Sequence, residues 1–449
     1  MTPQLPPTDH RPAAYHGPTR EETLALRQTY LTPGLLTYYR EPLMIVEGHM
    51  QYVYDERGTR YLDAFAGIVT VSVGHCHPKV VEKVRAQHGA LQHVTTIYLH
   101  PTIGELGKAL VDKLPAGVDK VYFTNSGSEA NEAAILAARE FTGSTDVVAL
   151  RNCYHGGTSL PMSLTAHGNW RFPSNPALNV HHAHAGYCYR CPYNLSYPSC
   201  DLRCAHDIEE TLAYQTSGQV ACFIAEPIQG VGGVVVPPKE YFQVVYDAVR
   251  RHGGLCIADE VQGGFGRTGE HYWSHEHWGV VPDIVTMAKG LGNGAPIGAM
   301  AARAEVSATL ARKVYFNTFG GNPVSVTQGL ATLEVIEEEG VQAHAARVGA
   351  ALKEGLESLA DKYPVIGEVR GLGLMLGVEL VECRTSKRPA TQLAADVVER
   401  CKAKGLLIGK GGLWGQTLRI KPPMCLSLDD AQFIIDCLDE TLAETPVTT

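Results

Sequence analysis

The stretch that decides the fold reads Leu255-Cys-Ile-Ala-Asp-Glu-Val-Gln262 and, after a glycine-rich turn, resumes as Pro282-Asp-Ile-Val-Thr-Met-Ala-Lys-Gly290. Each half contains a short apolar run of the kind found in buried parallel strands. The first run ends in Asp259 and the second in Lys289. Ligands of an open α/β sheet bind beyond the carboxyl ends of its strands. We therefore expect this acid and this amine to face one site.

An acid and an amine at one sheet edge suit a pyridoxal phosphate site. The amine of Lys289 would hold the cofactor aldehyde as a Schiff base, and Asp259 would keep the ring nitrogen protonated. The ring could then accept electrons from a substrate carbanion. Taken singly, each residue has an ordinary explanation, because an Asp often caps a turn and a Lys often reaches into solvent. The hypothesis therefore depends on convergent partners elsewhere in the chain.

Composition describes an ordinary globular protein. The 449 residues are 45% apolar and 19% charged, enough for two or three domains. A net charge of −9 leaves no basic face for nucleic acid, and no apolar run approaches the roughly 18 residues that cross a bilayer. Residues 1–18 show no signal or transit pattern, and twelve scattered cysteines fit reduced thiols. The sequence thus predicts a cytoplasmic location.

The order of elements predicts an α/β fold. Strands and helices alternate from residue 120 onward, which indicates βαβ units and a mainly parallel sheet covered by helices. After residue 323 the pattern changes to long amphipathic helices with short strands. We expect an arm and part of a small domain at 1–64, a large cofactor-binding domain at 65–323, and the remaining small α+β domain at 324–449.

A second candidate site element lies at Lys120-Val-Tyr-Phe-Thr-Asn-Ser-Gly-Ser-Glu-Ala130. This segment predicts a strand, a turn of small residues and the start of a helix, whose free N–H groups bind anions such as a cofactor phosphate. Gly127 allows close approach, and Ser128 adds a hydroxyl donor. Ser126-x-x-Glu129 also fits a plain capping box, which is compatible with the phosphate role.

A third apolar strand, at 220–226, ends in Glu226 at the same edge. A carboxylate there requires a cation, and Arg419 in the tail supplies one. Arg419 could pair with Glu226 or bind a substrate carboxylate through two hydrogen bonds. The alternative is a purely structural ion pair between the two domains.

Two further motifs have the spacing of known ligand-binding sites. Gly264-Phe-Gly-Arg-Thr-Gly269 has the spacing of a dinucleotide-binding loop, but no amphipathic helix follows it, so this interpretation is rejected. An insertion at 186–204 carries Cys188, Cys191, Cys200 and Cys204 with four-thiolate zinc spacing. A surface flap with free thiols is the alternative, and the sequence leaves the metal unassigned.

With these motifs in hand, the chain resembles the class III aminotransferases, a subgroup of the fold-type I pyridoxal-phosphate-dependent transferases, over about residues 34–442. Residues 67–79 look most like the mitochondrial-type alanine–glyoxylate aminotransferases, and residues 315–321 are shared with related phospholyases. The motifs that carry the resemblance are Asn125-Ser-Gly-Ser-Glu-Ala-Asn131, Glu226-Pro-Ile-Gln-Gly230, Ala258-Asp-Glu-Val-Gln262, Met287-Ala-Lys-Gly290 and Asn317-Thr-Phe-Gly-Gly-Asn-Pro323.

The resemblance implies a role for each matched position. Lys289 would be the Schiff-base lysine and the acid/base, with Asp259 on the ring nitrogen and Gln262 on the ring hydroxyl. Arg419 and Glu226 would form a substrate switch. The other implied cofactor contacts are Ser126, Gly127 and Ser128 at the phosphate, Tyr154 stacked on the ring, His155, Glu226, and Thr318 reaching the neighbouring subunit's cofactor. Shared sites imply a homodimer, and pairing into tetramers is left open.

The function implied is a transaminase that moves an amino group from an amino acid or ω-amine to pyruvate or glyoxylate, with alanine and glyoxylate as the first choice. A phospholyase acting on an O-phosphorylated amine and a β- or ω-amino acid–pyruvate aminotransferase are the alternatives. Members that use 2-oxoglutarate often carry an arginine where this chain has Gly157. Its absence favours a small oxo acid.

Overall fold

The computed structural model describes residues 3–174 and 179–444 and contains one large and two smaller sheets. The large sheet has seven strands in the order β4-β10-β9-β8-β7-β5-β6. Only β10 runs against its neighbours, and the other adjacent pairs are parallel. The strands are β4 (Lys120–Thr124), β5 (Val147–Leu150), β6 (Val180–Ala183), β7 (Cys222–Ala225), β8 (Leu255–Asp259), β9 (Ile284–Met287) and β10 (Gly298–Ala302). The predicted α/β class with a mainly parallel sheet is confirmed.

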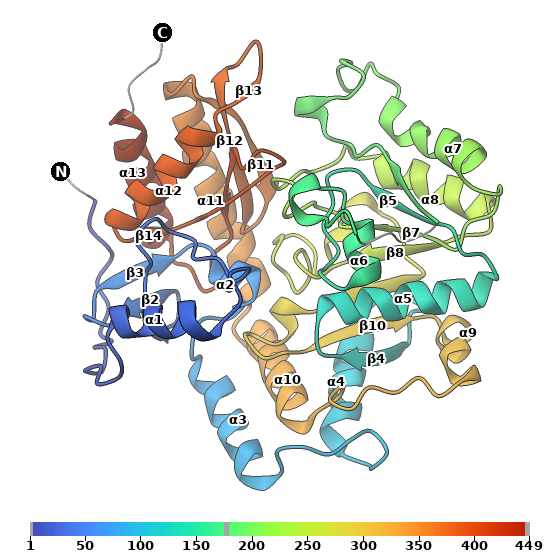
Figure 1. Ribbon diagram of the computed structural model, residues 1–449, viewed down its shortest axis with the longest axis horizontal. Helices are drawn as coiled ribbons and strands as arrows, with labels where there is room; N and C mark the ends of the chain where they lie inside the picture. Colours follow the sequence, from blue (N-terminus) through green and yellow to red (C-terminus); the bar gives the residue numbers. More distant parts are fainter. Residues whose placement is uncertain (1–2, 175–178, 445–449) are drawn as a thin grey trace.

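Helices cover this sheet, as Figure 1 shows for α5 (Gly127–Thr142) and α8 (Tyr241–Arg251). Helix α5 packs on β9 and β10 through a buried alanine-rich face, since alanine favours helix and permits close approach to the strands. The helix begins at Ser126, whose hydroxyl accepts a hydrogen bond from the Glu129 N–H, and it ends at Gly143, whose φ of 73° favours glycine. The same sheet is also covered by α7 (Arg203–Gln215), which packs on β6, and α4 (Pro101–Val111), which packs on β4. Helix α10 (Pro323–Glu338) packs on α4, and shorter helices lie at α6 (Ser159–Leu164) and α9 (Ala304–Ser307).

The smaller sheets combine the two ends of the chain. One has the order β1-β2-β3-β14, in which Leu62 of β3 lies opposite Leu406 of β14 in a parallel pair. The other has the antiparallel order β11-β12-β16-β15, with β13 on β12. Their strands are β1 (Ile45–His49), β2 (Tyr52–Asp55), β3 (Arg60–Asp63), β11 (Ile366–Leu372), β12 (Met375–Cys383), β13 (Arg388–Pro389), β14 (Leu406–Leu407), β15 (Gly409–Gly411) and β16 (Thr417–Ile420).

The helices of this part are α11 (Val341–Lys362), α12 (Thr391–Ala403) and α13 (Leu428–Ala443), which lie on the same side as the N-terminal strands in Figure 1. The segment 65–101 that leads to the large sheet holds α2 (Ala66–Val69) and α3 (Pro78–Ala90), and α1 (Arg20–Tyr30) precedes the strands. The division at residues 64 and 323 remains a proposal, which the shared β3–β14 pairing supports. Residues 1–2 of the predicted N-terminal arm and residues 445–449 of the predicted small domain lie outside the described residues.

Among the strands that the sequence did not predict is β10. Its sequence Gly298-Ala-Met-Ala-Ala302 contains none of the β-branched or aromatic residues that favour strands. Pairing with both β4 and β9 on either side nevertheless holds it in the sheet, and all five residues are buried. In the described part of the chain, no helix has the length and apolar character needed to cross a membrane.

Candidate active site

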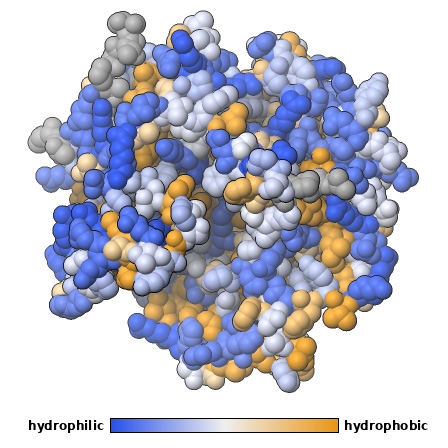
Figure 2. All heavy atoms as spheres, in the orientation of Figure 1, coloured by the Kyte–Doolittle hydropathy of each residue, from blue (hydrophilic) through white to orange (hydrophobic). Residues whose placement is uncertain are grey.

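A cavity of about 350 Å³ lies at the carboxyl ends of the large-sheet strands and at the N-terminus of α5. Figure 2 shows the face of Figure 1 hollowed near its middle, between the small sheets and the large one. The walls come from several loops that follow strands β5, β7, β8 and β9. The lining residues are Thr70, Asn125, Ser126, Gly127, Ser128, Asn131, Tyr154, His155, Gly156, Glu226, Asp259, Val261, Gln262, Ala288, Lys289, Gly294, Ala295, Pro296 and Ile297.

Lys289 follows β9 and enters the cavity from a single 3-10 turn, 289–291. Its φ of 41° lies in the left-handed region, which a non-glycine residue adopts at a cost and which occurs often at functional sites. Burial lowers the pKa of its amine, although Asp259 and Glu226 act in the opposite direction. A lowered pKa increases the share of neutral amine, the nucleophilic form.

Asp259 ends β8 and is 4% exposed. Its Oδ2 accepts hydrogen bonds from Asn131 Nδ2 at 2.9 Å and from His155 Nδ1 at 2.7 Å, while Oδ1 accepts from the Val261 N–H at 3.1 Å. Three donors on one carboxylate fix its orientation. The cavity therefore has a fixed negative charge at the end of β8.

His155 is the buried partner that completes this arrangement. Burial alone would lower its pKa, but Cys153 and Asp259 raise the pKa well above the usual histidine range. Its ring is fully enclosed, and Nε2 has no hydrogen-bond partner among the described residues. The imidazole thus acts on Asp259 through Nδ1, since the other nitrogen bonds nothing in the described chain.

The N-terminus of α5 forms the opposite end of the cavity. Gly127 and Ser128 are the first helical residues, so their N–H groups have no carbonyl one turn earlier to bond. An added Cβ at Gly127 would lie 3.0 Å from Val261 Cγ2, and one at Gly156 would lie 2.3 Å from Ser128 Oγ. The Gly157 N–H donates to Ser128 Oγ at 3.1 Å. Small residues therefore keep this helix end open for an anion.

Glu226 follows β7 and is 3% exposed, and burial raises the pKa of its carboxyl. Its oxygens accept from the N–H groups of Tyr154 at 2.9 Å and Gly230 at 2.8 Å. Gln262 Nε2 lies 3.5 Å from Glu226 Oε2, and Gln262 Oε1 accepts from Lys421 Nζ at 3.0 Å. The amide of Gln262 is thereby held between a carboxylate and an amine.

Arg419 lies on β16 and is 7% exposed. Its guanidinium carbon is 5.2 Å from the centre of the Phe65 ring, and Nε and Nη1 have no hydrogen-bond partner in the described chain. No ion pair between Arg419 and Glu226 occurs among the described residues, so the structure does not bring the expected switch pair into contact. A buried guanidinium with free donors is suited to an anionic ligand.

Two other residues that were predicted to contact the cofactor, Tyr154 and Thr318, lie in different places. Tyr154 lines the cavity, with its ring 5.3 Å from the Trp170 ring in an edge-to-face arrangement. Thr318 is exposed and does not line this cavity. Its expected role concerned a neighbouring subunit, so its position in one chain leaves that role a prediction.

Two residues of the site had no predicted role. Asn131 lies in the interior of α5 and joins Asp259 to the backbone oxygen of His155. An asparagine among buried alanines of a helix is itself a signal, because its amide competes with the helix backbone and needs a partner. Lys421 is fully buried and burial lowers its pKa well below the usual range. The hydrogen bond from Lys421 to Gln262 is seen only in the tertiary structure.

The cysteine-rich insertion holds its four thiols near one another, since burial and then the nearby Cys188, Cys191 and Cys200 raise the pKa of Cys204 to about 12. Its four thiols are not within 4.8 Å of one another, whereas Glu270, His271 and His277 are the described group that meets this spacing. The insertion docks on β12, where Arg190 Nε lies 2.5 Å from Glu379 Oε1 and the Tyr187 hydroxyl donates to the same carboxylate. The zinc interpretation of the thiols stays a prediction.

The cavity fits pyridoxal phosphate. An amine of lowered pKa, a carboxylate fixed by three donors, and a helix N-terminus cleared by glycines are the groups that the aldehyde, the ring nitrogen and the phosphate need. The residues that would hold the cofactor are thus Lys289, Asp259 and 126–128. Their roles remain proposals.

Comparison with known proteins gives a consistent result. Residues 37–442 match the family described as Aminotransferase class-III. The chain is 49% identical over 442 residues to alanine–glyoxylate aminotransferase 2 homolog 2, mitochondrial, of Arabidopsis thaliana, covering 98% of this chain and 91% of the relative. It is 38% identical over 462 residues to alanine–glyoxylate aminotransferase 2, mitochondrial, of Homo sapiens, covering 98% and 90%.

Solved structures agree. A phospholyase from Arthrobacter in complex with phosphoethanolamine aligns with a TM-score of 0.88 and 33% identity, covering 94% of this chain and all of the other. An amine transaminase from an uncultivated Pseudomonas species, in its pyridoxal-phosphate-bound form, aligns with a TM-score of 0.85 and 30% identity, covering 92% and 98%.

These relatives correct one expectation. The sequence predicted a cytoplasmic location, but the similar proteins from Arabidopsis thaliana, Homo sapiens and Pongo abelii are all named mitochondrial. The expectation was wrong; it depended on the composition, on the thiol content and on the lack of a recognised signal or transit pattern in residues 1–18. Receptors in the cell read addressing signals, which composition does not report.

Proposed function

Because this chain belongs to the class III aminotransferases, we propose that it is a transaminase that uses alanine as amino donor and glyoxylate as acceptor. The observation that carries the proposal is that the Lys289 amine, the Asp259 carboxylate and the N-terminus of α5 line one cavity. The names of the relatives support the choice of substrates.

The cofactor is pyridoxal phosphate, which supplies an electron-accepting ring when bound. We propose that Lys289 Nζ removes the proton from the α-carbon of the amino donor and returns a proton later in the cycle. The lowered pKa of this amine suits both tasks, because proton transfer is most efficient when the pKa lies near the working pH. Asp259, fixed by Asn131 and His155, holds a negative charge that does not move during the cycle.

Arg419 is the proposed holder of the substrate carboxylate. Its Nε and Nη1 have no hydrogen-bond partner in the described chain, so the guanidinium keeps donors for a substrate carboxylate. Glu226 is occupied by backbone N–H groups, so it does not need to be displaced before Arg419 binds a ligand. An α-carboxylate is present on both alanine and glyoxylate, and one cation therefore serves both half-reactions.

Gly157 supports a small acceptor. An added Cβ at this position would meet nothing within 4 Å, so no described side chain fills the space directly beside it. Arg419 is a buried cation for the carboxylate of the acceptor. One such cation suits glyoxylate or pyruvate, which have one carboxylate each, better than a dicarboxylate.

We propose that the chain works as a homodimer. Apolar side chains are exposed in two neighbouring segments, which meet where His93 contacts Phe319 with ring centres 5.3 Å apart. Figure 2 shows apolar residues along the lower edge of the molecule, where the loop between α3 and α4 lies in Figure 1. Such patches mark interfaces, and Thr318 lies within one of them. The exposed residues are Ile97, Tyr98, Leu99, Val314, Tyr315, Phe316 and Phe319.

The test follows the cofactor's aldehyde absorption band in the purified holoenzyme. L-alanine should abolish the band, and glyoxylate should restore it faster than pyruvate or 2-oxoglutarate does. Restoration fastest with 2-oxoglutarate would contradict the argument from Gly157. Lys289→Ala should abolish both amino transfer and the borohydride-fixable cofactor adduct, and near-native turnover of this variant would refute the proposed site.

The same assay distinguishes the alternatives. Release of inorganic phosphate from phosphoethanolamine, without an oxo acid, would instead identify a phospholyase, the activity named for the Arthrobacter structure. A faster loss of the band with β-alanine than with L-alanine would identify a β-amino acid donor.

A further inference from the structure

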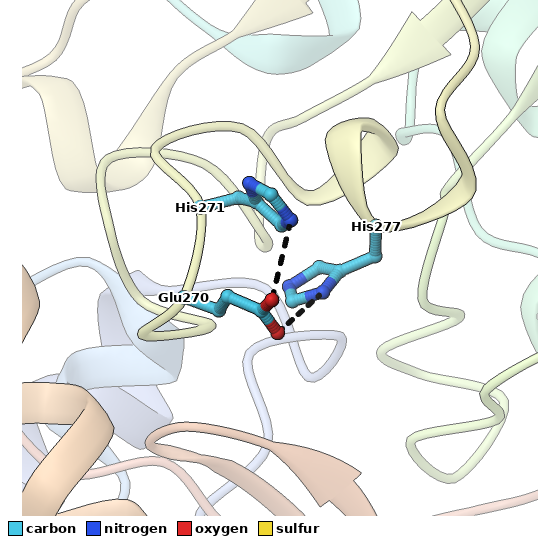
Figure 3. Close-up of side chains that lie close together, drawn as sticks. All are labelled: Glu270, His271 and His277. Carbon is cyan, nitrogen blue, oxygen red and sulfur yellow. Dashed lines mark ion pairs between the residues drawn. The ribbon is translucent and has the colours of Figure 1, made fainter.

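A second cluster of ligand-type side chains lies outside the active-site cavity, in the loop after the glycine-rich turn. Glu270, His271 and His277 bring one carboxylate and two imidazoles together, with their ligand atoms within 4.8 Å of one another (Figure 3). None of the three lines the catalytic cavity. The proposed transaminase reaction therefore gives them no role.

The groups of this cluster lie within ion-pair range of one another, marked by dashed lines in Figure 3, but beyond hydrogen-bond distance. His271 Nε2 lies 3.9 Å from Glu270 Oε1, and His277 Nδ1 lies 3.8 Å from Glu270 Oε2. A hydrogen bond between nitrogen and oxygen requires about 2.7–3.2 Å. Two ligands of a tetrahedral ion with bonds of about 2.1 Å lie about 3.4 Å apart. Each of the two distances to Glu270 therefore needs to shorten by only about half an ångström, and all three ligand atoms already lie within 4.8 Å of one another.

His277 provides a second, independent observation. Its side chain is only 10% exposed, and its ring faces the Glu270 carboxylate and the ring of His271, whose centre lies 4.6 Å away. Its Nε2 is buried and has no hydrogen-bond partner among the described residues. A buried ring nitrogen without a partner is costly, and coordination of the ion through Nε2, rather than through Nδ1, would offset that cost.

The backbone that carries the cluster is held in place by its surroundings. Trp273 is fully buried, and its indole N–H donates to the Lys113 carbonyl at 2.7 Å. The Ser274 hydroxyl donates to Glu260 Oε2 at 2.6 Å. Gln342 of α11 donates to the Glu270 carbonyl at 3.2 Å. These anchors fix the loop before any ion binds, which reduces the ordering that binding requires.

We propose that Glu270, His271 and His277 form a binding site for one divalent transition-metal ion, Zn²⁺ above all. Two imidazoles and a carboxylate are a ligand set of known catalytic zinc sites, and imidazole favours zinc over magnesium or calcium. Glu270 is 76% exposed, so the ion can enter from solvent and water completes its coordination. The ion joins the loop to the 274–278 turn, and its measurable effect is on stability.

The experiment titrates dialysed holoenzyme with Zn²⁺ by calorimetry and with Co²⁺ by its visible absorption. The native chain should bind one ion, and His271→Gln and His277→Gln should each weaken binding at least about tenfold. Binding should also raise the melting temperature of the native chain and not that of either variant. His16→Gln is the control, because His16 is exposed and outside the cluster.

A Cys188→Ser/Cys191→Ser variant separates this site from the thiols of the insertion, and it should bind Zn²⁺ as the native chain does. Absence of stoichiometric binding by the native chain would overturn the proposal. Loss of binding in the thiol variant with binding retained in His271→Gln would also overturn it. Near-native amino-transfer rates in His271→Gln would establish that its fold is intact.

Discussion

Replacing Asp259 by asparagine tests whether its charge, rather than its shape, organises the site. Asparagine can still accept from the Val261 N–H through its oxygen, but its NH₂ group would face the two donors that now bond Oδ2. His155 can relieve one conflict by losing a proton, since its raised pKa depends partly on Asp259. The Asn131 amide retains the other conflict, because it also bonds the His155 carbonyl.

One charge-assisted hydrogen bond lost in a buried site costs about 1.5–3 kcal/mol, so the apoprotein should lose about that much stability in urea unfolding. Loss of a preorganised charge beside the reacting centre should lower kcat by about a hundredfold to a thousandfold. Equilibrium unfolding and the alanine–glyoxylate assay measure the two effects separately.

Asp283→Asn provides the matched control. Asp283 is also a buried carboxylate and accepts from the Cys256 N–H at 2.8 Å and from Arg250 at 3.3 Å, but it lies at the start of β9, at the end away from the cavity. Its replacement should cost similar stability and leave kcat unchanged. An Asp259→Asn enzyme with native stability and native kcat would refute the proposed role of the charge.

Three further outcomes are expected. Gly156→Ala should weaken cofactor binding at least about tenfold in dialysis, since its Cβ would lie 2.3 Å from Ser128 Oγ at a φ of 134°, and native affinity would contradict this. Lys421→Met should keep the fold but lower kcat about tenfold, because it removes the donor to the Gln262 amide, whereas Lys421→Arg keeps a donor and should lower kcat less. A native kcat in Lys421→Met would show that packing alone matters. Because burial lowers the pKa of Lys289, the unfolded chain binds its proton more tightly, so this residue's contribution to apoprotein stability should rise with pH between the folded and the unfolded pKa. The rate of cofactor reattachment to the apoprotein should likewise reach its plateau below the ordinary lysine pKa, and a midpoint at the ordinary value would contradict the direction.

Local sequence determined the strands and the chemistry at their ends. Apolar runs that stop at Asp259, Glu226 and Lys289 indicate buried parallel strands by length and composition alone, and a parallel sheet presents all its carboxyl ends at one edge. The capped start of α5 was equally local, because a cap depends on residues only three positions apart.

Tertiary structure decided what these residues bond. The sequence contains no signal that joins Asn131 and His155 to Asp259, or Lys421 to Gln262 across 159 positions, because such contacts depend on how strands and helices pack. The same holds for β10, a strand only because two neighbours pair with it, and for the expected contact of Arg419 with Glu226, which the packing around Phe65 does not make. Residue types fix which chemistry a chain can perform, and the burial and distances set by the fold decide which groups perform it.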